Sequence, residues 1–85
     1  MKTFDYTIKD ELGIHARPAG LLVKEAVKFT SSVKLSCEGK ESDGKKLMAL
    51  MMMAVKTGQT VTFTIEGEDE EAAAAALQDF MNQNL

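Results

Sequence analysis

The one histidine of the chain lies within residues 13–19 (GIHARPA), two residues before an arginine. An imidazole titrates near neutral pH and can act as a nucleophile, so His15 could accept a phosphoryl group. The guanidinium of Arg17 is permanently charged, and its forked donors match phosphate oxygens. The two side chains together predict a site for phosphoryl chemistry.

A helix must begin next to this histidine. Proline is tolerated only in the first turn of a helix, so Pro18 places the helix start near Ala16 and puts His15 at or near the N-cap. First-turn N–H groups have no partner in the helix, and those of Ala16 and Arg17 would therefore form an anion site. Apolar residues then recur at helical spacing, at Ala16, Ala19, Leu22, Val23 and Ala26.

The rest of the chain alternates between strand and helix patterns. Three stretches show the period-2 alternation of half-buried strands: Phe4-Tyr6-Ile8, Val33-Leu35-Cys37 and Val61-Phe63-Ile65. A hairpin turn at Gly39-Lys40 would lead into a short strand near 41–43, and a short helix would follow over 46–53. The acidic run 68–71 would open a last helix that buries Ala73, Ala76, Leu77 and Phe80. The order β-α-β-β-α-β-α predicts an α+β fold, a four-stranded antiparallel sheet with helices on one face.

Length and composition narrow the function. The 85 residues predict one domain, 1–85, and the net charge of −3 argues against nucleic-acid binding. One His and one Cys exclude a zinc or iron–sulfur cage within the chain, and we expect no metal and no cofactor. The lone Cys37 is expected to be an inert core thiol in a reducing compartment. The acidic run 68–71 is interpreted as helix capping and solvation rather than metal binding.

The distribution of apolar residues bears on the location of the protein. The longest apolar run, 47–55, has nine residues, whereas a membrane-spanning helix needs about 20. The N-terminal residues show no apolar core of a signal peptide. We therefore expect a cytoplasmic protein without membrane insertion.

Residues 13–19 resemble the active-site segment of the histidine-containing phosphocarrier (HPr) family of the bacterial phosphoenolpyruvate:sugar phosphotransferase system. That segment reads Gly, Leu or Ile, His, Ala or Thr, Arg, Pro, Ala, and all seven positions match. The length, the position of His15 and the order of elements also agree. The resemblance implies the HPr fold, an open-faced β-sandwich with three helices covering one face of the sheet.

The resemblance also implies a function. His15 would accept a phosphoryl group on Nδ1 from phosphorylated enzyme I and pass it to a sugar-specific enzyme IIA. Arg17 would hold and orient the group, and the amides of Ala16 and Arg17 would face it. The protein would then be a phosphoryl carrier rather than an enzyme.

Methionine-rich residues 47–53 form a second unusual feature. Leu50 and Met53 could face the core, whereas the other large apolar residues would reach the surface, where flexible methionines suit several partners. In the HPr family the corresponding helix and the active-site helix dock onto enzyme I and enzyme IIA. The matching positions are Arg17, Gly20, Leu21, Lys24, Leu47, Met48, Met51 and Met52. We expect a monomer, because this face must stay exposed.

One position departs from the regulated members of the resembled family. In those members HPr kinase modifies a serine at the start of the second helix, where this sequence has Lys46. Lysine cannot take that phosphate, and Ser42 lies four residues too early. We therefore expect this regulatory modification to be absent.

Three other functions compete with a sugar-transport carrier. A paralogue with the same fold could serve a nitrogen-regulatory or other dedicated phosphorelay. The sequence alone barely distinguishes such a paralogue from a sugar-transport carrier. A regulatory binding module could dock partners without accepting phosphate, but it would not require both His15 and Arg17. A small enzyme with His15 as general base lacks a second convergent acid or nucleophile.

Overall fold

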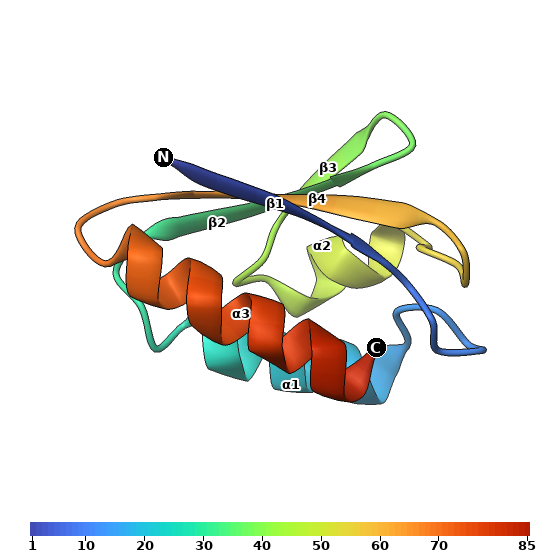
Figure 1. The fold of residues 1–85 in the computed structure, drawn as a ribbon. Coiled ribbons are helices and arrows are strands. Elements are labelled where there is room, and N and C mark those ends of the chain that lie inside the picture. Colours follow the sequence, from blue (N-terminus) through green and yellow to red (C-terminus); the bar gives the residue numbers. More distant parts are fainter.

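Four antiparallel strands and three helices alternate along the chain in the predicted order (Figure 1). The structure is a computed structural model that describes residues 1–85. The elements are β1 (Lys2–Thr7), α1 (Ala16–Ala26), β2 (Ser32–Cys37), β3 (Lys40–Asp43), α2 (Leu47–Met52), β4 (Thr60–Glu66) and α3 (Glu70–Asn84). The α+β prediction is confirmed. None of the three helices combines the length and the apolar character that a membrane-spanning segment requires.

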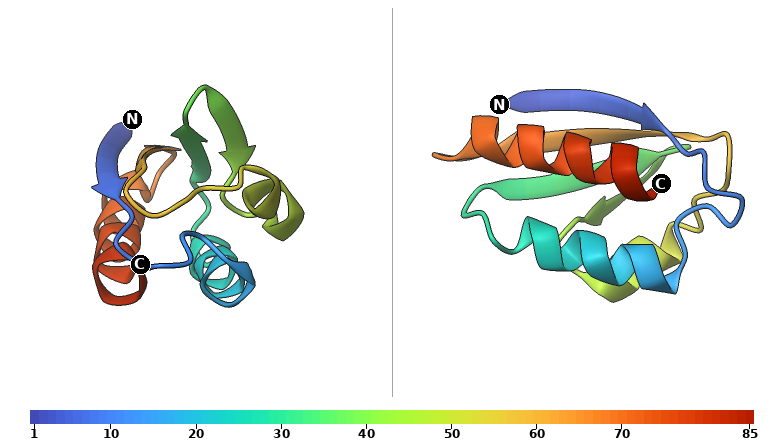
Figure 2. Two further views of the ribbon diagram at one scale, coloured as in Figure 1. Left: turned by 90° about the vertical axis from the view of Figure 1, so that its right-hand side faces the viewer. Right: turned by 60° about the horizontal axis from the view of Figure 1, so that its bottom comes forward.

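The strands form one sheet in the order β1-β4-β2-β3, and all three helices lie on the same side of it (Figure 2). In β2 and β4 alternate residues are buried, and in β1 Tyr6 is buried while Phe4 is only partly covered. The rings of Phe4 and Phe63 stack with centroids 4.6 Å apart. The other face, rich in threonine and serine, stays open to solvent, as expected when only one face of a sheet is covered.

The helices contribute buried side chains at helical spacing. On α1 the buried residues are Pro18, Ala19, Leu22 and Ala26. On α3 they are Ala73, Leu77 and Met81, each four residues apart. The predicted stripe on α3 was therefore partly wrong: Ala76 and Phe80 are only half-buried, and Met81 takes the place given to Phe80. A stripe that advances by four residues follows one face of the helix, because 3.6 residues make a turn.

Two further predictions need correction. The hairpin turn between β2 and β3 consists of Glu38 and Gly39, both with positive φ (51° and 80°), and Cys37 pairs with Lys40. The predicted turn was therefore one residue too late. Two-residue hairpins favour positive φ at both turn positions because that geometry matches strand twist. On α1, Ala16 is exposed rather than part of the buried stripe.

Asp69, at the N-cap of α3, does not cap its own helix with its side chain. Its carboxylate accepts hydrogen bonds from the backbone N–H groups of Thr30 and Ser31, both at 3.0 Å, and from the Ser31 hydroxyl. Ser31 itself is buried. Asp69 therefore ties the start of α3 to the loop that follows α1, and it holds the two helices together at that end.

We expect Asp69→Asn to remove part of the pH dependence of stability. The Ser31 hydroxyl and the Thr30 amide lower the pKa of Asp69 from 3.8 to about 2. Because the folded-state pKa lies below the unfolded value, this carboxylate stabilises the fold above about pH 4, and the stabilisation is lost as the pH falls through about 2. Urea unfolding at neutral and acidic pH should show a steeper acid decline in the parent than in Asp69→Asn. Asp79→Asn, an exposed change on α3, should keep the parent's slope; equal slopes in all three proteins would contradict the prediction.

Candidate functional site

His15 is the N-cap residue of α1, as predicted, with extended backbone angles (φ −111°, ψ 177°). Its imidazole makes no capping hydrogen bond, and its side chain is 34% exposed. The first hydrogen bond of the helix runs from Ala19 N to His15 O at 2.9 Å. The N–H groups of Ala16 and Arg17 precede it and have no partner four residues back in the helix. The positive end of the α1 dipole therefore lies directly beside the imidazole.

The loop before α1 is fixed by contacts with the segment that follows α2. Ile14 N donates to Val55 O at 3.0 Å, and Ile14 is buried. Gly13 has a φ of +68°, and a Cβ built there would lie 2.2 Å from Val55 O. Only glycine can both adopt this backbone conformation and approach so closely. These contacts set where His15 sits relative to the body of the protein.

A shallow pocket of about 280 Å³ surrounds the histidine. It is lined by Asp10, His15, Arg17, Pro18, Leu21 and Asn84. The structure thus brings the two predicted chemical residues, His15 and Arg17, into one pocket. It also adds two polar residues that the sequence did not indicate, Asp10 and Asn84. Asp10 precedes the histidine by five residues in a loop without periodicity, and Asn84 comes from the end of α3.

One ion pair of the chain contains His15, and none contains Arg17. Asp10 Oδ1 lies 3.6 Å from His15 Nε2. None of the other ion pairs uses Arg17, whose side chain is exposed. The pocket therefore offers an imidazole, a free guanidinium and the N-terminal amides of a helix, a set suited to binding phosphate around a nucleophilic nitrogen.

Beside the pocket, α1 and α2 pack together (Figure 2). Both helices expose apolar side chains. Met48 and Met52 are 71% and 76% exposed, and Leu21 and Leu47 are also exposed. Leu50 and Met53 are buried, as predicted. Met51, predicted to reach the surface, is half-buried against the core. Lys24 is exposed and Gly20 is half-buried.

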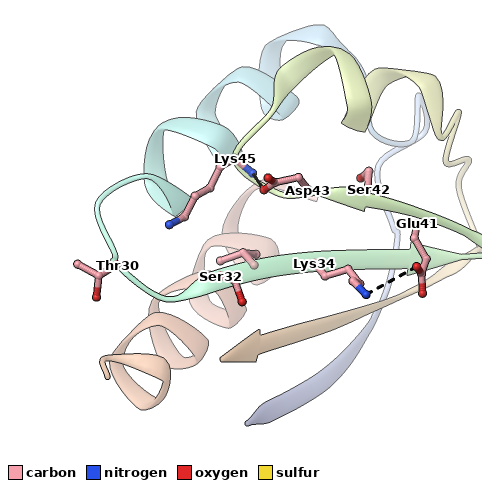
Figure 3. Close-up of a pocket in the computed structure, with 8 residues that line it drawn as sticks. Thr30, Ser32, Lys34, Glu41, Ser42, Asp43 and Lys45 are labelled. Carbon is pink, nitrogen blue, oxygen red and sulfur yellow. Dashed lines mark hydrogen bonds and ion pairs between the residues drawn. The ribbon is translucent and has the colours of Figure 1, made fainter. Parts of the chain in front are cut away.

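The largest pocket of the protein, about 550 Å³, lies away from the histidine at the β2–β3 edge of the sheet (Figure 3). Several of its polar groups have partners: Lys34 Nζ lies 3.7 Å from Glu41 Oε1, and the backbone N–H of Lys45 donates to Asp43 Oδ1 at 2.9 Å. Lys45 Nζ donates to Phe29 O at 2.8 Å. None of its lining residues is a histidine or a cysteine. The smaller pocket at His15 is therefore the better candidate for nucleophilic chemistry.

Cys37 is not a competing nucleophile. Its side chain is buried on the inner face of the sheet, and burial raises the pKa of its thiol. A thiol that stays protonated is a poor nucleophile.

Lys46 stands at the N-cap of α2 and is exposed.

Comparisons with known proteins agree on one family. Residues 2–83 match the family model "PTS HPr component phosphorylation site". The phosphocarrier protein HPr of Lysinibacillus sphaericus is 41% identical over 83 residues, which cover 98% of this chain and 94% of the relative. The HPr-like protein Crh of Bacillus subtilis is 41% identical over 78 residues, 92% of each chain.

Solved structures give the same result. A histidine-containing phosphocarrier protein of Mycoplasma superposes with a TM-score of 0.94 at 38% identity, covering 96% of this chain and 93% of that one. A structure of an HPr dimer from Thermoanaerobacter tengcongensis also matches, with a TM-score of 0.77 at 38% identity over 98% and 95% of the two chains. The chain therefore belongs to the HPr family, whose members are phosphocarriers of the phosphotransferase system rather than catalysts.

Proposed function

We propose that His15 carries the phosphoryl group, which it receives from phosphorylated enzyme I and gives to an enzyme IIA. The lone pair of Nδ1 attacks the phosphorus, the bond between the phosphorus and the donor breaks, and an Nδ1–P bond forms while Nε2 keeps its proton. The second transfer repeats this displacement with Nδ1 as the leaving group. The observation that carries the proposal is the position of His15 at the start of α1 in one pocket with Arg17.

Arg17 and the amides of Ala16 and Arg17 would hold the phosphoryl oxygens. A helix N-terminus stabilises a negative group by about 0.3–1 kcal/mol at an exposed site. That modest stabilisation suits a carrier, which must release the group it holds. The shallow pocket likewise leaves the phosphorus open to attack by the next acceptor, and the partner proteins would supply the remaining groups for transfer.

The partners would dock on the face formed by α1 and α2. Its exposed apolar residues are Leu21, Leu47, Met48 and Met52, and Arg17 and Lys24 on α1 are exposed as well. Gly20 on α1 and Met51 on α2 are half-buried. An apolar surface with a cationic rim fits partner surfaces that carry negative charge. We propose a monomer in solution, because a free α1–α2 face is needed for docking. The HPr of Thermoanaerobacter tengcongensis was solved as a dimer, so the oligomeric state of this protein should be measured.

We also propose that regulation through a serine at the start of α2 is absent. Lys46 occupies the N-cap position and carries a positive charge where phosphorylation would add a negative one. The nearest serine, Ser42, lies in β3 and is half-buried, with its hydroxyl on the sulfur of Met53 at 2.8 Å. Its place in the sheet supports the proposal that it does not replace the missing serine.

The test is incubation with phosphoenolpyruvate and enzyme I, followed by intact-mass measurement before and after mild acid. We expect an acid-labile phosphoryl increment in the parent protein and no increment in His15→Ala. Failure of the parent to gain the increment with an active enzyme I would refute the proposal.

A second assay separates the remaining alternatives. If the phosphorylated protein passes its group to sugar-specific enzyme IIA domains, it serves sugar transport. If it passes the group only to enzyme IIA domains of a nitrogen-regulatory relay, the paralogue reading holds. A regulatory binding module would take no phosphoryl group from enzyme I, and retention of both His15 and Arg17 weighs against it.

A further inference from the structure

Asp10, which follows the end of β1, is held in place by hydrogen bonds of its backbone. Its N–H donates to Leu85 O at 2.9 Å, which links the loop to the end of α3. Its carbonyl oxygen accepts hydrogen bonds from Gly13 N at 3.0 Å and from the hydroxyl of Thr57. Two distant segments of the chain and the loop itself therefore fix the backbone of this residue.

The side chain of Asp10 is also fixed. Oδ1 accepts a hydrogen bond from Leu12 N at 2.9 Å, so the carboxylate closes a tight turn within the loop. The same oxygen lies 3.6 Å from His15 Nε2. Both side chains are about one-third exposed, at 34% for His15 and 30% for Asp10. A small rotation of the imidazole would bring Nε2–H into hydrogen-bond distance of the carboxylate, as catalytic pairs often do only when substrate is bound.

We propose that Asp10 is a positioning residue for phosphoryl transfer through His15. Its carboxylate holds the imidazole with the proton on Nε2, which leaves the lone pair on Nδ1, the nitrogen proposed to attack the phosphorus. A carboxylate that orients a histidine through its other nitrogen serves the same purpose in hydrolase triads. This inference rests on the proposed function, because it assigns a role in the transfer for which His15 is proposed.

Charge gives Asp10 a second effect in both directions of transfer. When the Nδ1–P bond forms, the ring keeps its Nε2 proton and becomes positively charged, and the nearby carboxylate stabilises that charge. The same form of the ring is the better leaving group when the bond breaks. The imidazole ring separates the carboxylate from the phosphoryl group, whose charge Arg17 and the helix amides offset. Asp10 should therefore speed acceptance and also shorten the lifetime of the phosphorylated protein.

The variant Asp10→Asn tests this role. Asparagine keeps an oxygen for Leu12 N, so the turn is preserved while the negative charge is lost. We expect single-turnover transfer from phosphorylated enzyme I to slow about tenfold, the effect of one nearby charge at a partly exposed site. Spontaneous hydrolysis of the phosphorylated variant should slow by several-fold, and the ¹⁵N shift of His15 Nε2 should change.

Asp43→Asn is the matched control. Asp43 closes the same type of turn, with Oδ1 accepting from Lys45 N at 2.9 Å, but it lies at the β2–β3 edge away from the histidine. We expect parent rates and a parent Nε2 shift in this control. Urea unfolding of both variants checks that the fold is kept.

The outcomes distinguish this inference from the proposed function. If the parent accepts no phosphoryl group, the proposed function fails. If the parent is phosphorylated on His15 but Asp10→Asn matches it in transfer rate, hydrolysis rate and Nε2 shift, Asp10 has no positioning role and the carrier function stands. If transfer slows only because the variant has lost stability, hydrolysis and the Nε2 shift of the folded fraction stay at parent values, which also overturns the inference.

Discussion

Replacing Arg17 with alanine is expected to slow phosphoryl transfer from enzyme I by about 100-fold, because donors aimed at charge that develops during reaction contribute about that much. The guanidinium is exposed and takes no part in the ion pairs of the chain. The free energy of unfolding should therefore change by less than about 0.5 kcal/mol. Quenched-flow transfer and urea unfolding measure the two quantities.

Two variants sharpen the Arg17 prediction. Arg17→Lys should transfer at an intermediate rate, because lysine keeps the charge but not the forked donors. Lys28→Ala removes a cation near the far end of α1, where Lys28 pairs with Glu25 at 3.1 Å, and it should transfer like the parent. If Arg17→Ala transferred within a factor of about two of Lys28→Ala, Arg17 would have no role beyond general charge.

Gly13→Ala is expected to lower the free energy of unfolding by about 3 kcal/mol, since it combines a strained backbone with a steric clash. The added Cβ would meet Val55 O at 2.2 Å and Lys56 Cα at 2.8 Å. Both are backbone atoms, so the loop itself must move. That movement would also displace His15, and transfer should slow in the fraction that remains folded.

Gly58→Ala is the control for Gly13. Gly58 also has a positive φ, +85°, but a Cβ there has open space. The control should lose only about 1 kcal/mol, the cost of the left-handed conformation alone. Equal losses of stability in the two variants would show that the contact with Val55 does not constrain the loop.

Local rules were sufficient to predict the helix start and most of the sheet. Pro18 and the apolar spacing of α1 placed His15 at the N-cap, and alternation placed Val33, Leu35 and Cys37 on the inner face. These features depend on residues close in sequence. The hairpin turn was misplaced by one residue because Glu38 takes a conformation that glutamate rarely adopts, so its residue type gave no signal.

Contacts between distant segments could not be predicted. Asp69 looked like a helix-capping residue, but its carboxylate binds Thr30 and Ser31 because folding brings the end of α1 beside the start of α3. Asp10 lies beside His15 only because Thr57 and Leu85 hold its backbone. The pattern of neighbouring residues in the sequence does not indicate which distant segments the fold brings into contact. The site was therefore found through its local motif, while one proposed member of it required the structure.

The order of strands in the sheet bears on when the fold can form during synthesis. β1 pairs with β4, so the first strand can join the sheet only after Val61, the partner of Tyr6, has been synthesised. The loop that carries His15 is held by backbone hydrogen bonds to Val55 and to Leu85. Contacts between residues so far apart in the sequence slow folding, because the intervening chain must first be ordered. We therefore expect this loop to reach its final position only after α3 has been synthesised.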